Sequence, residues 1–155
     1  MKTSYFGRMN SNEFKHRQAE AVSIARGSKY WRGRSYAPLF PTWEMIHMSD
    51  PVEYERVYRQ KILARLDPMH VYCELVEMCG EDPILLCHES AAKIESGEQF
   101  CHRTIVAKWL EAELWAEYDM DIKIPELRSA KSDLKEILKR SESKKIQTDF
   151  EQMKW

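Results

Sequence analysis

The stretch Pro83-Ile84-Leu85-Leu86-Cys87-His88-Glu89 decides the fold of this chain, because it joins an apolar run directly to polar and reactive side chains. A short, continuous apolar run is typical of a strand buried on both faces of a parallel sheet. Ligands bind to such sheets in the crevice beyond the carboxyl ends of the strands. The run therefore predicts a central strand over 83–87 and a functional site that starts where this strand ends.

Other segments predict strands and helices around this central strand. Residues 3–7 (TSYFG) and 21–25 (AVSIA) are predicted strands, and 118–124 is a predicted last strand. Asp50-Pro51 and Asp67-Pro68 each supply a helix cap and a first-turn proline, and Gly80 predicts the end of the second helix. Residues 101–115 carry the apolar stripe of a third helix.

This alternation of strands and helices predicts an α/β fold. We expect a single domain whose mostly parallel sheet, of about four strands, is covered by helices on both faces. The length of 155 residues fits one core. Residues 1–126 form the predicted α/β domain with a ligand pocket, and 127–141 are predicted to form an amphipathic C-terminal helix packed on it, with Leu127, Leu134 and Leu138 on one stripe. Residues 142–155 read as a polar tail.

The composition excludes several classes of protein. Hydrophobic residues make up 43% and charged residues 32%, which is too apolar for a disordered chain. No stretch approaches the roughly 18 apolar residues of a membrane span, and the first residues show no secretion signal, so we predict a cytoplasmic protein without a membrane partner. In that compartment the four cysteines are expected to be reduced thiols. Residues 1–36 hold eight Lys or Arg against two Asp or Glu, which allows a local basic site in a chain of net charge -1.

Polar and reactive side chains follow each of the three best strands, and a parallel sheet brings them to one edge. The helix predicted at Cys101-His102-Arg103 would direct its positive end toward that edge, which favours an anion and lowers the pKa of Cys101. We therefore predict one anion pocket. Its predicted ligand-binding residues are Arg8, Arg26, Trp31, Arg32, Cys87 and Arg103. Its predicted catalytic residues are Glu89, Cys101 and His102.

A structural role for the same residues is the alternative interpretation. Cys87 and Cys101 would then be small core residues, and the arginines would pair with Glu89 to close the edge of the sheet. In the functional interpretation Glu89 transfers a proton or attacks the substrate, since burial and nearby arginines can tune a carboxylate. His102 could serve as an acid or base, or point away from the site.

The sequence resembles a known family in these segments. The runs ILLCHE and FCHRTIVAKWLEAE, preceded by SYFGR, VSIARG and a tryptophan-rich loop, are similar to the YeaO-like domain of unknown function family of bacteria and phages. The resemblance covers roughly residues 3–124 and is most specific at Cys87-His88-Glu89, where the family often has Cys-Tyr-Glu, and at Cys101-His102-Arg103. It implies an α/β fold and a shared site, and it brings no established reaction.

Several other chemistries find little support in the spacing of these residues. Two Cys-His pairs twelve residues apart lack the Cys-x2-4-Cys pattern of a zinc site, and no Cys-x-x-Cys redox motif is present. A phosphatase loop of the form Cys-x5-Arg is absent, as are G-x-G-x-x-G and Walker sequences. We therefore predict neither a metal nor a cofactor.

The predicted ligand is a small, phosphate-bearing nucleotide, a nucleotide derivative or a nucleic-acid end. Aromatic residues interleaved with basic ones in the irregular segment 27–43 suit stacking on a base while charge holds phosphate. We expect this role of Trp31, whereas Trp43 is expected to pack in a satellite core. The enzyme reading is a nucleotide-directed hydrolase or transferase. The alternative is a non-catalytic module that sequesters a nucleotide or binds another protein. Such a module could be encoded by a phage.

Overall fold

Strand β4 (Ile84–Cys87) is an inner strand of a four-stranded sheet, and all four of its side chains are buried. The computed structural model describes residues 1–29, 31–131, 133–135 and 138. The sheet is parallel throughout, in the order β1-β4-β2-β3. Leu85 of β4 pairs with Thr3 of β1 (Lys2–Tyr5) on one side and with Val22 of β2 (Ala21–Ser23) on the other. The central strand and the parallel α/β fold predicted from the apolar run are thus confirmed.

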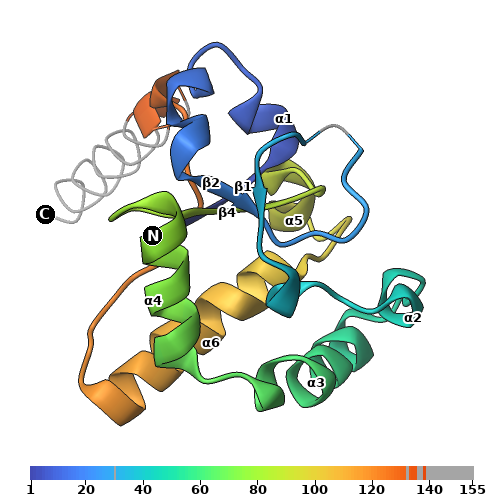
Figure 1. The fold of residues 1–155 in the computed structure, drawn as a ribbon. Coiled ribbons are helices and arrows are strands. Elements are labelled where there is room, and N and C mark those ends of the chain that lie inside the picture. The colour runs from blue at the N-terminus through green and yellow to red at the C-terminus, as the bar shows by residue number, and fades with distance from the viewer. Residues whose placement is uncertain (30, 132, 136–137, 139–155) are drawn as a thin grey trace, which may run out of the picture.

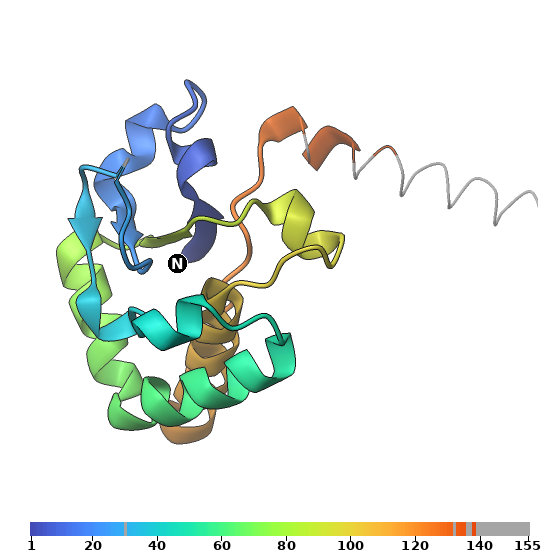
Figure 2. The ribbon, with the colours of Figure 1, turned by 90° about the vertical axis from the view of Figure 1, so that its right-hand side faces the viewer.

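Helices cover both faces of the sheet (Figures 1 and 2). One face packs against α3 (Pro51–Lys61), α4 (Pro68–Cys79) and α6 (His102–Tyr118). The other face packs against the short helix α1 (Phe6–Met9) and the 3-10 helix at Lys15–Glu20. Two hydrophobic cores result, one on each side of the sheet, and Leu85 and Leu86 of β4 point into different ones.

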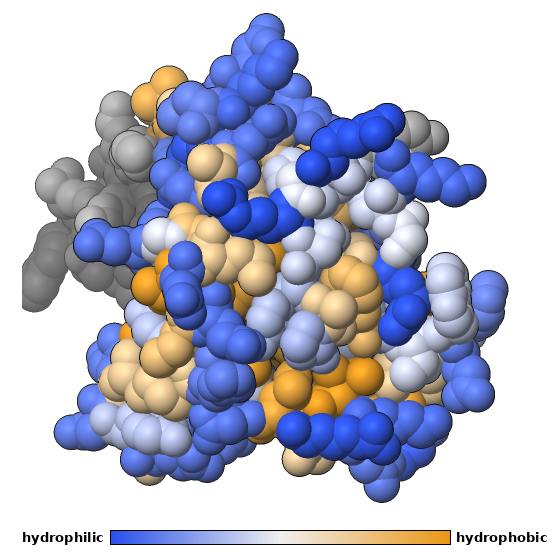
Figure 3. Space-filling view, in the orientation of Figure 1, coloured by the Kyte–Doolittle hydropathy of each residue, from blue (hydrophilic) through white to orange (hydrophobic). Residues whose placement is uncertain are grey.

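The remaining elements are short. They are β3 (Arg34–Ser35), α2 (Trp43–Ile46), α5 (Ala91–Glu95) and 3-10 turns at Ala37–Leu39 and Leu63–Arg65. Polar side chains dominate the face shown in Figure 3, and hydrophobic ones come to the surface mainly in its lower half. No helix among the described residues combines the length and the apolar character needed to cross a bilayer.

The structure confirms the residues predicted to cap α3 and α4. The Asp50 carboxylate accepts a hydrogen bond from the Val52 amide at 2.9 Å, and the Asp67 carboxylate accepts one from the His70 amide at 2.6 Å. Gly80 ends α4 with a φ of +86°, a backbone conformation that side chains disfavour. These local interactions fix where α3 and α4 begin and where α4 ends.

The strand predicted over 118–124 is wrong. Helix α6 continues to Tyr118, and Asp119 ends it in the left-handed conformation with a φ of 56°. The chain reaches the sheet only at Glu126, which forms an isolated parallel bridge to Thr3. The strands predicted over 3–7 and 21–25 are also shorter than expected, because the chain turns into α1 after Tyr5 and into the irregular segment after Ser23.

The described C-terminal residues differ in burial along the chain. Leu127 is buried, whereas the side chains of Leu134 and Leu138 are 58% and 53% exposed. Helical backbone begins at Ala130. The polar tail predicted over 142–155 lies outside the described residues.

Asp82, just before β4, gives the fold a defined pH dependence. It pairs with Lys2 of β1 and with Arg17, whose Nη2 lies 2.8 Å from its carboxylate. Burial raises the pKa of Asp82, but these cations outweigh burial and hold the pKa well below its usual range. The stabilisation is therefore present above the unfolded pKa of about 3.9 and is lost as pH falls from there toward the lower folded pKa.

We expect Asp82→Asn to lower the free energy of unfolding more at pH 7 than at pH 3. Urea denaturation at both pH values measures the difference. Glu44→Gln is the control, because Glu44 is exposed and pairs only with exposed Lys61 at 3.4 Å. An equal effect of Asp82→Asn at both pH values would show that its ion pairs do not stabilise the fold.

Candidate functional site

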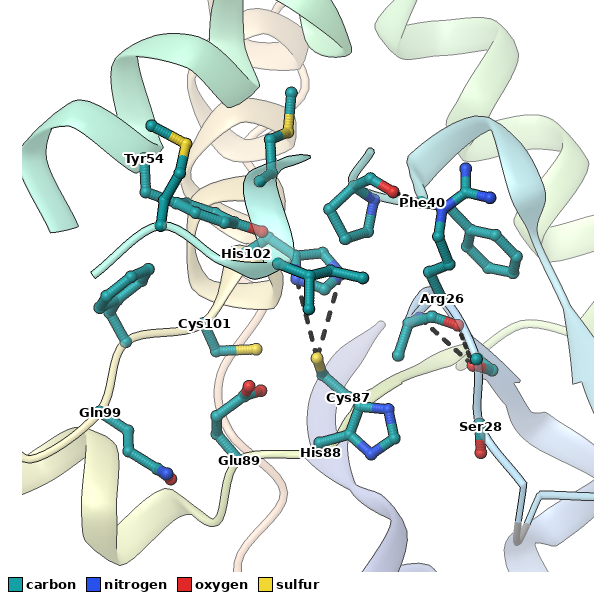
Figure 4. Close-up of a pocket in the computed structure, with 18 of the residues that line it drawn as sticks. Arg26, Ser28, Phe40, Tyr54, Cys87, His88, Glu89, Gln99, Cys101 and His102 are labelled. Atoms are coloured by element: carbon teal, nitrogen blue, oxygen red, sulfur yellow. Dashed lines mark hydrogen bonds between the residues drawn. The ribbon is translucent and has the colours of Figure 1, made fainter. Parts of the chain in front are cut away.

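A large cavity opens at the carboxyl edge of the sheet. Its volume is about 1110 Å³, and its walls come from β2, β4, the segment after β2, α2, α3 and the start of α6. Cys87, Glu89, Cys101 and His102 lie together at one end of it, as Figure 4 shows. Its other lining residues include Arg26, Lys29, Trp31 and Trp43. The sheet edge predicted from the strand ends is therefore hollow and carries both reactive and basic side chains.

Two buried cysteines and a buried histidine form a cluster in this cavity. Cys87 is the last residue of β4, and Cys101 and His102 begin α6. The sulfur and nitrogen ligand atoms of the three side chains lie within 4.8 Å of one another. The Cys87 Sγ lies 3.7 Å from His102 Nδ1. The connection from β4 through α5 to α6 thus brings Cys101 and His102 to Cys87, while the His88 ring packs against Phe6.

A backbone carbonyl fixes the orientation of the His102 ring. The His102 Nε2 lies 2.8 Å from the Ile24 carbonyl oxygen, just beyond β2. Because a carbonyl can only accept, Nε2 carries the proton and donates it to this bond. Nδ1 is then the unprotonated ring nitrogen, and the Cys87 Sγ lies 3.7 Å from Nδ1 and 4.0 Å from Nε2.

The two thiols of the cluster have pKa values shifted in opposite directions. Burial raises the pKa of Cys101, but hydrogen bonding to Cys87 and His102 outweighs burial and lowers the pKa to about 6. Burial raises the pKa of Cys87 well above its usual value, and the Cys101 thiolate raises it further. The predicted lowering of the Cys101 pKa is confirmed in direction. Its main source is the neighbouring side chains of the cluster.

Glu89 points into the same end of the cavity, beside the two thiols (Figure 4). Its Oε2 atom is buried and has no hydrogen-bond partner within the described part of the chain. Burial raises the pKa of this carboxyl, but interactions with the thiols of Cys101 and Cys87 lower it overall. A buried carboxylate oxygen without a partner is costly in a finished core, and it is expected where a ligand supplies the partner.

Arg103 does not reach the cavity, contrary to prediction. Its side chain is completely buried, and its Nε and Nη2 atoms each lie 3.2 Å from the Glu126 carboxylate. Its Nη1 donates to the Glu89 backbone carbonyl at 2.6 Å. Arg8 also turns toward Glu126, at 3.9 Å. The predicted pocket shared by Arg8, Arg26 and Arg103 is therefore not formed, because Glu126, the last residue of the predicted domain, pairs with two of them.

Arg26 is the predicted arginine that lines the cavity. Its Nε donates to the Pro41 carbonyl at 2.6 Å, which holds the side chain across the irregular segment. Its guanidinium carbon lies 5.5 Å from the Trp43 ring and 5.8 Å from the Phe40 ring. Trp31 also lines the cavity, and its ring nitrogen donates to the Arg34 carbonyl at 2.8 Å.

Two predictions about the irregular segment need correction. Arg32 is exposed and is not among the lining residues. Trp43 is 62% exposed and lines the cavity, so it is not part of a satellite core. Tyr54, in α3, is a lining residue that sequence reasoning missed, because nothing in a helical stripe indicates that one of its members faces a site.

Scans of the chain against protein-family models, curated proteins and solved structures find no match.

Proposed function

We propose that the cavity binds a small phosphate-bearing ligand of the nucleotide class, including nucleotide derivatives and nucleic-acid ends. The observation that carries the proposal is the meeting, in one cavity, of a cationic and aromatic side with a reactive Cys-His-Glu end. Its volume of about 1110 Å³ is slightly above the usual range for small-molecule sites, about 300–1000 Å³, and leaves room for a base, a sugar and phosphates.

The two sides of the cavity suit the two parts of such a ligand. Arg26 and Lys29 are cations whose neighbourhood favours phosphate oxygens. Trp31 and the exposed Trp43 offer ring faces on which a base can stack. A ligand that spans this side would extend toward Glu89 and Cys101, where a phosphoryl or glycosyl bond would lie among the reactive groups.

We further propose that the protein hydrolyses or transfers part of this ligand. Glu89 would accept the proton of an attacking water or acceptor hydroxyl, whose oxygen displaces the leaving group from the phosphorus or glycosyl carbon, and Cys101 and His102 would hold the reacting groups beside it. The second candidate function is non-catalytic sequestration of the same ligand. The lining favours it in one respect: Arg26, Lys29 and the rings of Trp31 and Trp43 supply charge and stacking, and sequestration needs no acid or base.

Two further expectations belong to the same proposal. Membership of the YeaO-like family is supported by the position of its most specific residues, because Cys87, Glu89 and Cys101 lie together although loop residues separate them in the sequence. A cytoplasmic location is supported by the four cysteines, which are free thiols.

Arg26→Ala is expected to weaken nucleotide binding by about 1.5–3 kcal/mol, the typical contribution of a hydrogen bond to a charged group. Calorimetry with nucleoside mono-, di- and triphosphates and a short single-stranded oligonucleotide measures the affinity. Arg32→Ala is the matched control, because Arg32 lies in the same segment and does not line the cavity. If no member of the panel binds the wild-type protein, or if both variants weaken binding equally, the proposed site is wrong.

A further inference from the structure

We propose that Cys87, Cys101 and His102 bind one Zn²⁺ ion, with a fourth coordination position that faces the cavity. Nothing in the proposed nucleotide binding requires this ion, so the inference goes beyond that function. The spacing of these residues in the sequence matches no zinc motif. The fold, however, places two sulfur atoms and an imidazole nitrogen within 4.8 Å of one another. Ligands of this type and number are those of catalytic zinc sites with two cysteines and one histidine.

The distances suit tetrahedral coordination. Zinc-sulfur bonds of about 2.3 Å and zinc-nitrogen bonds of about 2.0–2.1 Å place neighbouring ligand atoms about 3.5–3.8 Å apart. The Cys87 Sγ and His102 Nδ1 atoms are already 3.7 Å apart. The remaining separations, at most 4.8 Å, close with small side-chain rotations.

His102 is held as metal-bound histidines are held. Such histidines donate the second ring N-H to a carboxylate or a backbone carbonyl, which fixes the ring and its tautomer. Here His102 Nε2 donates to the Ile24 carbonyl at 2.8 Å, and Nδ1 is the atom left for the metal. The His102 side chain is buried, so a metal ion bound at Nδ1 would lie inside the protein and not on its surface.

Charge balance also favours a divalent cation. Two thiolates and a neutral imidazole carry a charge of minus two, which Zn²⁺ neutralises. The position of Cys101 is also consistent with a metal ligand. Cys101 occupies the N-cap of α6, but its side chain makes no capping hydrogen bond, so its sulfur is free to face the cluster.

Glu89 marks the open side of the proposed site. Its Oε2 is buried without a hydrogen-bond partner and points toward the two thiols (Figure 4). A water molecule or ligand oxygen in the fourth coordination position would give this oxygen a partner. We therefore assign Glu89 a place beside the coordination sphere and outside it, as in zinc sites where a carboxylate accepts a proton from metal-bound water.

The test uses the full-length protein, reduced with a phosphine and stripped with a chelator. Titration with Co²⁺, a spectroscopic substitute for Zn²⁺, is expected to saturate at one ion per chain. Thiolate charge-transfer absorption and the intense visible bands of a tetrahedral ion should appear, and Zn²⁺ should displace them. Absence of a stoichiometric ion, or an octahedral Co²⁺ spectrum without thiolate bands, overturns the proposal.

Variants locate the ion. Cys87→Ser, Cys101→Ser and His102→Gln should each weaken Co²⁺ binding by more than about 100-fold, the upper end of the loss caused by removing an outer-shell partner. Cys79→Ser is the matched control, since Cys79 is also buried but lies outside the cluster. Circular dichroism confirms that each variant folds. Equal binding by all four variants would place the ion elsewhere and overturn the proposal.

Thiol labelling of the wild-type protein tests the same site without any substitution. Zn²⁺ should slow alkylation of Cys101 at least tenfold and leave exposed Cys73 unchanged as an internal reference. Glu89→Gln should keep the tetrahedral Co²⁺ spectrum, and loss of the ion would overturn the open fourth position. Failure of nucleotide binding would leave all these readouts intact, so the two proposals fail separately.

Discussion

Arg103→Met is expected to lower the free energy of unfolding by about 3–5 kcal/mol, the usual loss when one partner of a buried ion pair is removed. Arg103 is the largest fully buried side chain, and its guanidinium forks onto the Glu126 carboxylate. Without it, Glu126 keeps the Thr3 hydroxyl at 2.8 Å and Arg8 at 3.9 Å, and the Glu89 carbonyl loses the Arg103 donor. Urea denaturation followed by circular dichroism measures the change.

A second substitution separates the charge effect from the loss of packing. Arg103→Met combined with Glu126→Leu should recover part of the lost stability, because an apolar pair removes the stranded carboxylate. Arg56→Met is the control for an exposed pair, since Arg56 and Glu53 form an ion pair on the surface of α3, and it should change stability little. An unfolding midpoint for Arg103→Met equal to that of the wild type would contradict the assigned role.

Glu89→Gln is expected to reduce turnover of a bound nucleotide by about 100- to 10,000-fold while binding stays equal or becomes tighter. The amide keeps the shape of the side chain but can no longer accept a proton. A carboxylate near a phosphate also repels it in the ground state, so its removal relieves repulsion. Product analysis on the samples used for calorimetry measures turnover and affinity together.

The same pair of measurements distinguishes an enzyme from a sequestering module. Glu98→Gln is the matched control, because Glu98 also lines the cavity but belongs to the loop before α6 and carries no proposed role. If the wild-type protein binds a nucleotide and yields no product, and Glu89→Gln weakens binding as much as Arg26→Ala does, then the non-catalytic function is the correct one.

Local signals in the sequence predict much of this fold. The apolar run 83–87 identifies the inner strand because parallel strands are buried on both faces. Asp50, Asp67 and Gly80 identify helix ends because caps act within one turn. The strand predicted over 118–124 is wrong because distant contacts, not local signals, decide the structure there. Its residues suit either a helix end or a strand, and the bridge between Glu126 and Thr3 that decides where the chain meets the sheet is a contact between distant parts of the sequence.

The candidate site was likewise predictable only in part. The rule that ligands bind at the carboxyl ends of parallel strands brings Cys87, Glu89 and Cys101 together correctly. The rule does not predict which acidic residues the arginines pair with. Arg8 and Arg103 pair with Glu126, which lies far from them in the sequence. The rule also says nothing about side-chain direction within a helix start, where His102 faces the cavity while Arg103 faces away from it.

The hydrogen bond from Arg103 Nη1 to the Glu89 carbonyl bears on which changes of loop length the fold can accommodate. This bond closes the connection between β4 and α6 at its base, so residues 90–99 form a side loop whose ends are held independently of its length. Lengthening a flexible loop costs only about 0.6 kcal/mol for each doubling. Insertions in the exposed turn at Ser96-Gly97, after α5, are therefore expected to leave Cys87 and Cys101 in place. This loop is the place where a new segment of protein can be grafted beside the cavity.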